Sequence, residues 1–196
     1  MKQIKKNINT QKYWNNIFKK EKFGIGREFL YSSVAKFIKD ENNKYKNKQS
    51  HILDIGCALG HGTIRIQEVL KNSLVDACDF SDVAIKKAKN NYKNINFFVH
   101  DVNKDKLTNN YDMIVMIETL EHLDNPIKAV KKYLKCCKQM IIVTPYDERN
   151  DENKEISAEH THSFDEFTFS KIKEFKKFSI FKIPNTNLNM IIYFFS

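Results

Sequence analysis

The sequence has no long apolar run, and this absence excludes a membrane-spanning helix. The longest apolar stretch, Met190 to Phe195, is the length of a strand, whereas a span needs about 18 residues. Residues 1–10 are polar and basic and contain no apolar core of a signal peptide. We therefore expect a soluble, cytoplasmic protein without membrane insertion.

Paired cysteines are also missing. The four cysteines, Cys57, Cys78, Cys136 and Cys137, form no C-x-x-C pair, and the adjacent Cys136 and Cys137 are poorly placed for an ordinary disulfide. The sequence therefore predicts buried, reduced thiols, as in cytosolic proteins.

Arginine is scarce although the chain is basic. The formal net charge of +9 comes from 33 Lys and Arg against 24 Asp and Glu, but no arginine cluster indicates nucleic-acid recognition. The charge fits either a solvated surface or attraction to an anionic partner, namely nucleic acid or a phosphorylated small molecule. Of the three arginines, Arg65 is expected on the surface. Arg27 and Arg149 fall in segments expected to cap the site, where either could bind phosphate or carboxylate.

The chain divides into a helical extension and an alternating core. Apolar residues recur at helical spacing around Trp14 and again over 29–38, and a polar linker over 42–50 follows them. We expect residues 1–50 to cap the substrate site and residues 51–196 to form the cofactor-binding core of a single-domain protein.

Within the core, strand-like and helix-like segments alternate, which predicts an α/β fold with a doubly wound, Rossmann-like, mostly parallel seven-stranded sheet. A short helix is expected after Thr168, and then an antiparallel hairpin at the sheet edge. The expected strands cover 51–55, 74–80, 95–100, 111–117, 140–144, 178–183 and 190–195, and the expected core helices cover 62–70, 82–92 and 126–134.

The ends of the first three strands carry candidate cofactor residues. Asp54 lies in a turn with Gly56 and Gly60, where a carboxylate suits a cofactor with a cationic amino-acid portion. Asp79 ends the second strand and can accept hydrogen bonds from ribose hydroxyls. Phe80, beside it, can pack against adenine.

At the end of the third strand, Asp101 can accept from an adenine amino group. Asp54, the glycine turn, Asp79 and Asp101 together resemble the pattern of the class I methyltransferases that use S-adenosylmethionine (SAM). This resemblance covers roughly residues 50–196. It implies methionine contacts near Asp54, Gly56 and Gly60, ribose contacts at Asp79, and adenine contacts at Asp101 and Val102.

One position departs from the family pattern, because Ala58 stands where the family has its middle glycine. The same alanine, together with Asp54, breaks the G-x-G-x-x-G pattern and argues against an NAD-linked oxidoreductase. A non-catalytic cofactor-binding or partner-binding relative is a further alternative. The intact Asp54, Gly56 and Asp79 argue against it.

A second constellation follows the fourth strand. If Glu118 begins a helical turn, Glu118, Glu121 and His122 share one face, and together they suit Mg²⁺ or Mn²⁺. A fourth ligand could come from the loop over 159–164. Many class I methyltransferases carry a similar signature without metal. There the first glutamate sits by the cofactor and the histidine shapes the substrate pocket.

The Glu-x-x-Glu-His signature also resembles the catechol O-methyltransferases of ubiquinone synthesis and the small-RNA 3′-terminal 2′-O-methyltransferases. That resemblance implies a metal shell of Glu118, Glu121, His122 and His162, with His160 in a poorer register. A metal would lower the proton affinity of an acceptor hydroxyl. Without metal, His122 or His162 would be the general base.

For the acceptor, the first hypothesis is O-methylation of a small polar or phosphorylated metabolite or sugar. The compact size and the Tyr-Trp-Asn opening look like small methyltransferases of bacterial surface-glycan pathways. The charge and the metal signature favour, as the alternative, the 2′-hydroxyl at an RNA end. A quinone-precursor catechol comes third. The sequence leaves the oligomeric state open.

Overall fold

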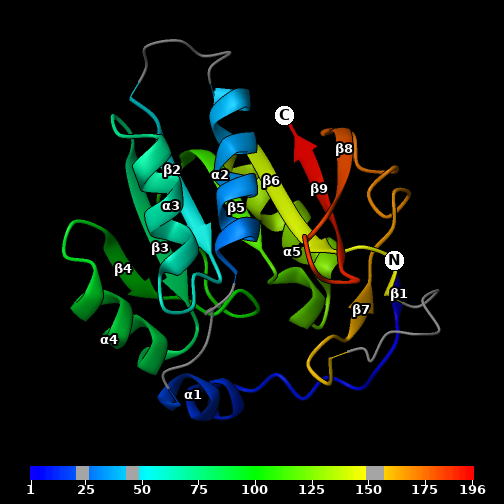
Figure 1. The fold of residues 1–196 in the computed structure, drawn as a ribbon, viewed down its shortest axis with the longest axis horizontal. Coiled ribbons are helices and arrows are strands. Elements are labelled where there is room, and N and C mark those ends of the chain that lie inside the picture. The colour runs from blue at the N-terminus through cyan, green and yellow to red at the C-terminus, as the bar shows by residue number, and fades with distance from the viewer. Residues whose placement is uncertain (21–26, 43–48, 149–156) are drawn as a thin grey trace.

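Residues 1–20, 27–42, 49–148 and 157–196 are described by a computed structural model (Figure 1). Its centre is a seven-stranded sheet with the order β4-β3-β2-β5-β6-β9-β8. Among these strands, β9 runs antiparallel to both of its neighbours, and the other pairs are parallel. The predicted doubly wound α/β fold with a C-terminal hairpin is therefore confirmed. The strands are β2 (His51–Ile55), β3 (Leu74–Asp79), β4 (Asn96–Val99), β5 (Tyr111–Ile117), β6 (Cys137–Pro145), β8 (Phe175–Lys182) and β9 (Asn189–Phe195).

Helices cover both faces of the sheet. Alternate residues of a strand point to opposite faces, and β5 follows this rule. Met113 and Val115 pack with α2 and α3, whereas Ile114 and Met116 pack on the opposite face with Tyr133 of α5. The helices are α1 (Gln11–Lys19), α2 (Glu28–Asn42), α3 (His61–Val69), α4 (Asp82–Asn91) and α5 (Pro126–Tyr133), with 3₁₀ turns over Leu120–His122 and Leu134–Cys136. Within the described residues, none of the helices has the length and apolar character needed to cross a membrane.

The strand order reverses between β2 and β5. From β2 the chain winds outward to β3 and β4, and from β5 it winds the other way to β6. The loops after β2 and β5 consequently diverge and leave a crevice at the carboxyl edge of the sheet, which is where open α/β sheets bind ligands.

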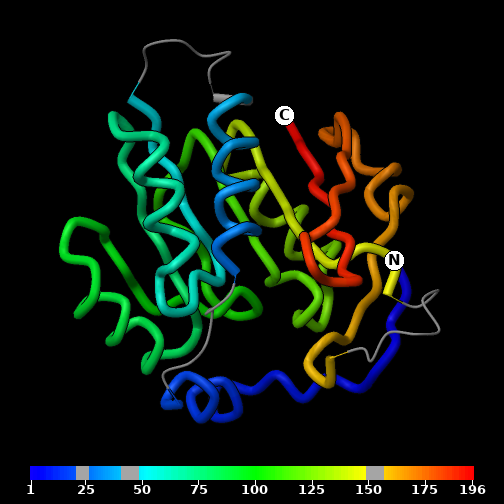
Figure 2. Tube along the Cα trace, viewed as in Figure 1, coloured from blue at the N-terminus to red at the C-terminus, as the bar shows by residue number. Residues whose placement is uncertain are grey.

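The first twenty residues extend along this edge of the molecule, and we call residues 1–20 the N-terminal strap. Its strand β1 (Lys2–Gln3) pairs with β7 (His162–Ser163), and α1 lies below the ends of β2 and β3 (Figure 1). The path of the strap is easily followed as the dark blue tube in Figure 2. The sequence predicted α1 but neither of the two short strands.

The short helix predicted after Thr168 is wrong. The chain there forms successive turns, in which Ser170, Ile172 and Phe175 each donate their amide N–H to the carbonyl three residues earlier. Phe169 and Ile172 are buried by these turns. A three-residue apolar spacing is common to a helix and to such turns, so the pattern did not distinguish them.

Candidate active site

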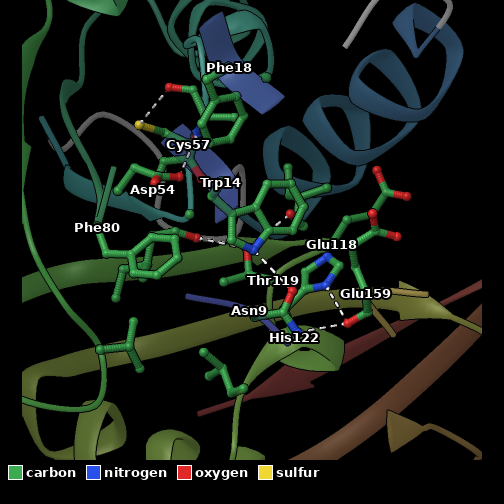
Figure 3. Close-up of a pocket in the computed structure, with 18 of the residues that line it drawn as sticks. Asn9, Trp14, Phe18, Asp54, Cys57, Phe80, Glu118, Thr119, His122 and Glu159 are labelled. Atoms are coloured by element: carbon green, nitrogen blue, oxygen red, sulfur yellow. Dashed lines mark hydrogen bonds between the residues drawn. The ribbon is translucent and has the colours of Figure 1, made fainter. Parts of the chain in front are cut away.

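A cavity of about 310 Å³ occupies the crevice at the carboxyl edge of the sheet (Figure 3). Its walls come from the ends of β2, β3, β4 and β5, from the N-terminal strap, and from residues just before β7. Eight of the predicted site residues line it, namely Asp54, Gly56, Asp79, Phe80, Asp101, Val102, Glu118 and His122. Gly60, Glu121 and His162 are not among the lining residues.

The turn after β2 has left-handed backbone at three positions. Gly56 (φ 83°), Ala58 (φ 48°) and Gly60 (φ 85°) all have positive φ, which glycine adopts most readily. A Cβ on Gly56 would lie 2.2 Å from Thr119 Oγ1, because the loops after β2 and β5 touch there. Ala58 takes the same kind of conformation without glycine's freedom.

Asp54 is a buried carboxylate inside the glycine turn. Its Oδ2 accepts a hydrogen bond of 2.6 Å from the hydroxyl of Thr63. Burial raises the pKa of Asp54 to about 6, and the nearby Asp79 also raises it. Burial disfavours the charged form of this carboxylate. A bound cation would stabilise that charged form, so the site is suited to a cationic group.

Asp79 is held by the backbone on two sides. Its Oδ2 accepts from the N–H of Ala58 at 3.0 Å, and its Oδ1 accepts from the N–H of Ser81 at 2.9 Å. Burial raises the pKa of Asp79 to about 6 against the opposing effect of these bonds. Phe80 follows it in the cavity wall. The carboxylate is thus fixed in orientation at the end of β3.

The residues after β4 line the cavity, but their carboxylate, Asp101, is only partly buried. Burial acts to raise the pKa of Asp101, but hydrogen bonds from Lys104 and from the N–H of Asn103 outweigh it and lower that pKa. His100, just before it, bonds the Tyr133 hydroxyl through Nε2 at 2.7 Å. Val102 and Asn103 complete this part of the lining.

An ion pair that the sequence did not reveal lies at the end of β5. Arg27, just before α2, pairs with the carboxylate of Glu118 across 91 residues of chain. The expectation that Glu118 begins a helical turn is wrong, because its φ is 49° and the 3₁₀ turn starts at Leu120. Glu118 therefore faces Arg27 instead of sharing a helical face with Glu121 and His122.

Three other side chains do converge. One ligand atom each from Glu121, His122 and His160 lies within 4.8 Å of the others. Both oxygens of Glu121 are buried without a hydrogen-bond partner, and burial raises its pKa to about 8. Burial and the neighbouring His160 lower the pKa of His122 to about 4.

The two imidazoles are oriented from behind. His122 Nδ1 lies 3.1 Å from the backbone oxygen of Glu159, so it carries the proton and leaves Nε2 as an acceptor. His160 Nδ1 lies 2.9 Å from both carboxylate oxygens of Glu148. Partners of this kind fix histidine tautomers in metal sites.

The structure does not bring His162 to this group. His162 lies in β7, is buried, and has Nδ1 3.0 Å from the hydroxyl of Thr161. His160 takes the position that the sequence hypothesis had given to His162. His162 lies opposite Gln3 in the pairing of β7 with β1 and is not among the residues that line the cavity. Arg149, the second predicted anion-binding arginine, lies outside the described residues.

The N-terminal strap forms one wall of the cavity. The ring of Trp14 packs 5.0 Å from that of His122 and donates its Nε1–H to Asn9 at 3.0 Å (Figure 3). Tyr13 donates its hydroxyl to the carboxylate of Glu159, and Gln11 donates to the backbone oxygen of Phe80. The strap therefore contacts both the end of β3, at Phe80, and the histidine side of the cavity.

A family model described as a methyltransferase domain matches residues 27–183. The chain belongs to this family. Its fold is that of the class I SAM-dependent methyltransferases, as its strand order and its structural neighbours agree.

Curated relatives match a part of the chain. A malonyl-acyl-carrier-protein O-methyltransferase of Bacillus anthracis is 30% identical over 90 residues, which are 45% of this chain and 33% of that protein. A putative methyltransferase of Invertebrate iridescent virus 6 is 30% identical over 115 residues, 54% of this chain and 42% of that one. The chain thus spans less than half the length of these relatives.

Solved structures match nearly the whole chain. The plantazolicin methyltransferase BpumL in complex with S-adenosylhomocysteine (SAH) gives a TM-score of 0.69 at 15% identity, covering 94% of this chain and 89% of that one. The N-methyltransferase NodS from Bradyrhizobium japonicum, also with SAH, gives 0.68 at 15% identity, covering 93% and 97%. At this identity the likeness concerns the fold.

Proposed function

We propose that this protein binds SAM in the cavity and transfers its methyl group to a small acceptor. The observation that carries the proposal is the set of oriented carboxylates around the turn at Gly56. Asp54 would take the cofactor's ammonium group, Asp79 the ribose hydroxyls, and Asp101 with Val102 the adenine. The SAH-bound neighbours and the family membership support this assignment.

The protein's part in such a reaction is alignment. SAM supplies a methyl group already activated by its sulfonium, so the residues mainly hold the reacting groups in line. The strap would shield the reacting groups from water through Trp14 and Phe18, which line the cavity and are both buried. In the absence of a metal ion, His122 Nε2, unprotonated near neutral pH, can accept the proton of an acceptor hydroxyl.

A divalent metal fits part of this site. Glu121 offers a buried carboxylate without a partner among the described residues. His122 and His160 each have Nδ1 bonded, which leaves Nε2 as the candidate ligand atom. Two imidazoles and one carboxylate suit a first-row divalent ion such as Mn²⁺ better than Mg²⁺, which prefers oxygen. Such an ion would act as a Lewis acid toward the acceptor oxygen.

The metal hypothesis predicts a thermal shift. Mn²⁺ at about 100 times its dissociation constant should stabilise the protein by about 2.7 kcal/mol, or roughly 5–10 °C for a chain of this size. Glu121→Gln keeps the volume but removes the anionic ligand, so the shift should vanish. Glu68→Gln, an exposed carboxylate, is the matched control and should retain it. A full shift in Glu121→Gln would refute the site.

The cavity lining favours an uncharged acceptor. The carboxylates of Asp54, Asp79, Asp101, Glu118 and Glu159 line it, and among the described lining residues Arg27 is the one lysine or arginine. A phosphorylated acceptor would meet this negative field, so we propose a neutral hydroxyl instead. A second candidate is an acceptor carried on an acyl carrier protein, supported by the names of several relatives.

Calorimetric titration with SAH and with methylthioadenosine tests the proposal. The second ligand lacks the amino-acid portion, whose carboxylate we assign to Arg27. Wild-type protein should bind SAH at about one site per chain. Arg27→Ala should weaken SAH by roughly 10–100-fold, as expected for losing a charged partner, and leave methylthioadenosine unchanged.

Arg65→Ala is the control for this comparison, because Arg65 is exposed and pairs with Glu68. It should alter neither affinity. Absence of SAH binding to the wild type would refute the proposed function. Equal losses for both ligands in Arg27→Ala would refute only the assignment of Arg27.

A further inference from the structure

The N-terminal strap carries most of the net charge of the chain. Residues 1–20 contain six lysines and neither Asp nor Glu, so their side chains contribute +6 of the formal +9. All six lysines are exposed, and they are Lys2, Lys5, Lys6, Lys12, Lys19 and Lys20. None of the ion pairs seen among the described residues includes Lys12, Lys19 or Lys20.

The strap has two chemically opposite sides. Its inner side is apolar, with Trp14 and Phe18 buried over the cavity, while Lys12 and Lys19 project from the outer side of the same helix. Among the residues that the structure describes, the charged ones that line the cavity beneath are five carboxylates and one arginine. An anionic molecule is therefore attracted to the outside of the strap and disfavoured inside the cavity.

We propose that the outer side of the N-terminal strap docks a small acidic protein that presents the methyl acceptor on a flexible covalent arm. The proposal rests on the proposed methyl transfer and names its partner. A basic surface such as the outer side of the strap attracts acidic partners and speeds their association. Only the arm, with its uncharged acceptor, would enter the cavity. The acidic protein itself would stay outside, because the carboxylates of the lining disfavour anions.

Two other anionic partners fit the strap less well. A membrane surface is bound by helices that insert their apolar face, but the apolar face of α1 is already buried, with Trp14 and Phe18 at most 8% exposed. Single-stranded RNA is bound by exposed aromatic rings. Tyr13, the remaining ring of α1, is instead engaged with Glu159.

The test measures binding of an acyl carrier protein loaded with a hydroxyacyl group, whose hydroxyl is uncharged, as fluorescence anisotropy at low and high salt. The test variant is Lys12→Glu/Lys19→Glu/Lys20→Glu. The control variant, Lys131→Glu/Lys135→Glu/Lys176→Glu, makes the same charge change at exposed lysines of α5, the turn after it, and β8. Wild-type binding should weaken steeply with salt. The test variant should lose at least about tenfold in affinity at low salt and the control less than about threefold.

Titration with SAH separates the outcomes. Both variants should bind SAH as the wild type does. Equal losses in the two variants, or no carrier binding by a wild type that binds SAH, would overturn the docking proposal and leave the methyltransferase proposal standing. Selective loss of binding to anionic vesicles or to single-stranded RNA, with no carrier binding, would overturn it in favour of that partner. Failure of wild type to bind SAH would instead overturn the proposed function.

Discussion

Asp54→Asn should make the ligand-free protein more stable at pH 7.5 and at the same time weaken SAH binding by at least about tenfold. Burial raises the pKa of Asp54 from 3.8 to about 6, a displacement worth about 3 kcal/mol at most. The amide avoids the burial of a charge. Because Thr63 can reverse its hydroxyl to suit an amide, we expect a net gain of about 1–2 kcal/mol.

The sign of the pH dependence follows from the raised pKa. The folded state holds the proton of Asp54 up to about pH 6, whereas the unfolded chain releases it near pH 4. The raised pKa of Asp54 therefore stabilises the wild-type protein at low pH, and this contribution is lost as the pH rises from about 4 to about 6. The advantage of Asp54→Asn should be complete above pH 6 and absent below about pH 4, as measured by thermal unfolding across that range.

Asp79→Asn is the matched comparison, since the pKa of Asp79 is raised to the same value by the same cause. Asp79 accepts two backbone N–H groups, one on each oxygen. An amide can accept only one of them, and the other is left buried and unpaired, at about 1–3 kcal/mol. We expect no stabilisation in this variant. A clear gain in Asp79→Asn, or none in Asp54→Asn, would contradict the argument.

Gly56→Ala should destabilise the protein by about 3–5 kcal/mol and abolish SAH binding. The new Cβ would lie 2.2 Å from Thr119 Oγ1 at a φ of 83°. The two loops at the strand reversal would have to separate, and they form the floor of the cavity. Denaturant unfolding and SAH titration measure the two effects.

A second substitution isolates the clash. Gly56→Ala/Thr119→Gly removes the opposing side chain, so part of the stability should return while the strain at positive φ stays. Gly60→Ala shares the positive φ, but its Cβ would meet ring atoms of Phe97 and Tyr92 at 3.0 Å. Its loss should be smaller. Equal losses at both glycines would mean that backbone strain, and not contact with Thr119, limits this turn.

The sequence predicted the fold and the convergence of three carboxylates on one cavity, because both depend on local patterns. Apolar runs mark the strands, and the carboxyl ends of parallel strands must meet at one edge. Asp54, Asp79 and Asp101 follow three neighbouring strands, so their convergence needs no knowledge of side-chain packing. Ala58 shows the limit of a motif. Its backbone keeps the left-handed conformation although the glycine is missing.

The histidine side was predicted less well because long-range pairings decide it. His160 and His162 are two residues apart, and no local pattern indicated that β7 would pair with β1 and include His162. Arg27 finds Glu118 across the molecule through a left-handed residue that helical spacing does not anticipate. The orphaned carboxylate of Glu121 is likewise visible only after packing.

The position of β9 has a consequence for the order in which the chain assembles. β9 lies between β6 and β8, although it follows both in the sequence. During translation, β6 can pair with β5 at once. Its other edge stays unpaired until β9 is made, and β9 begins about forty residues later. Synthesis of this segment takes roughly 2–9 s. The side chains over Met140–Val143 are fully buried in the finished sheet. In that interval the nascent chain should expose the unpaired backbone edge of β6, which can aggregate. We expect chaperones to bind the chain mainly at this stage.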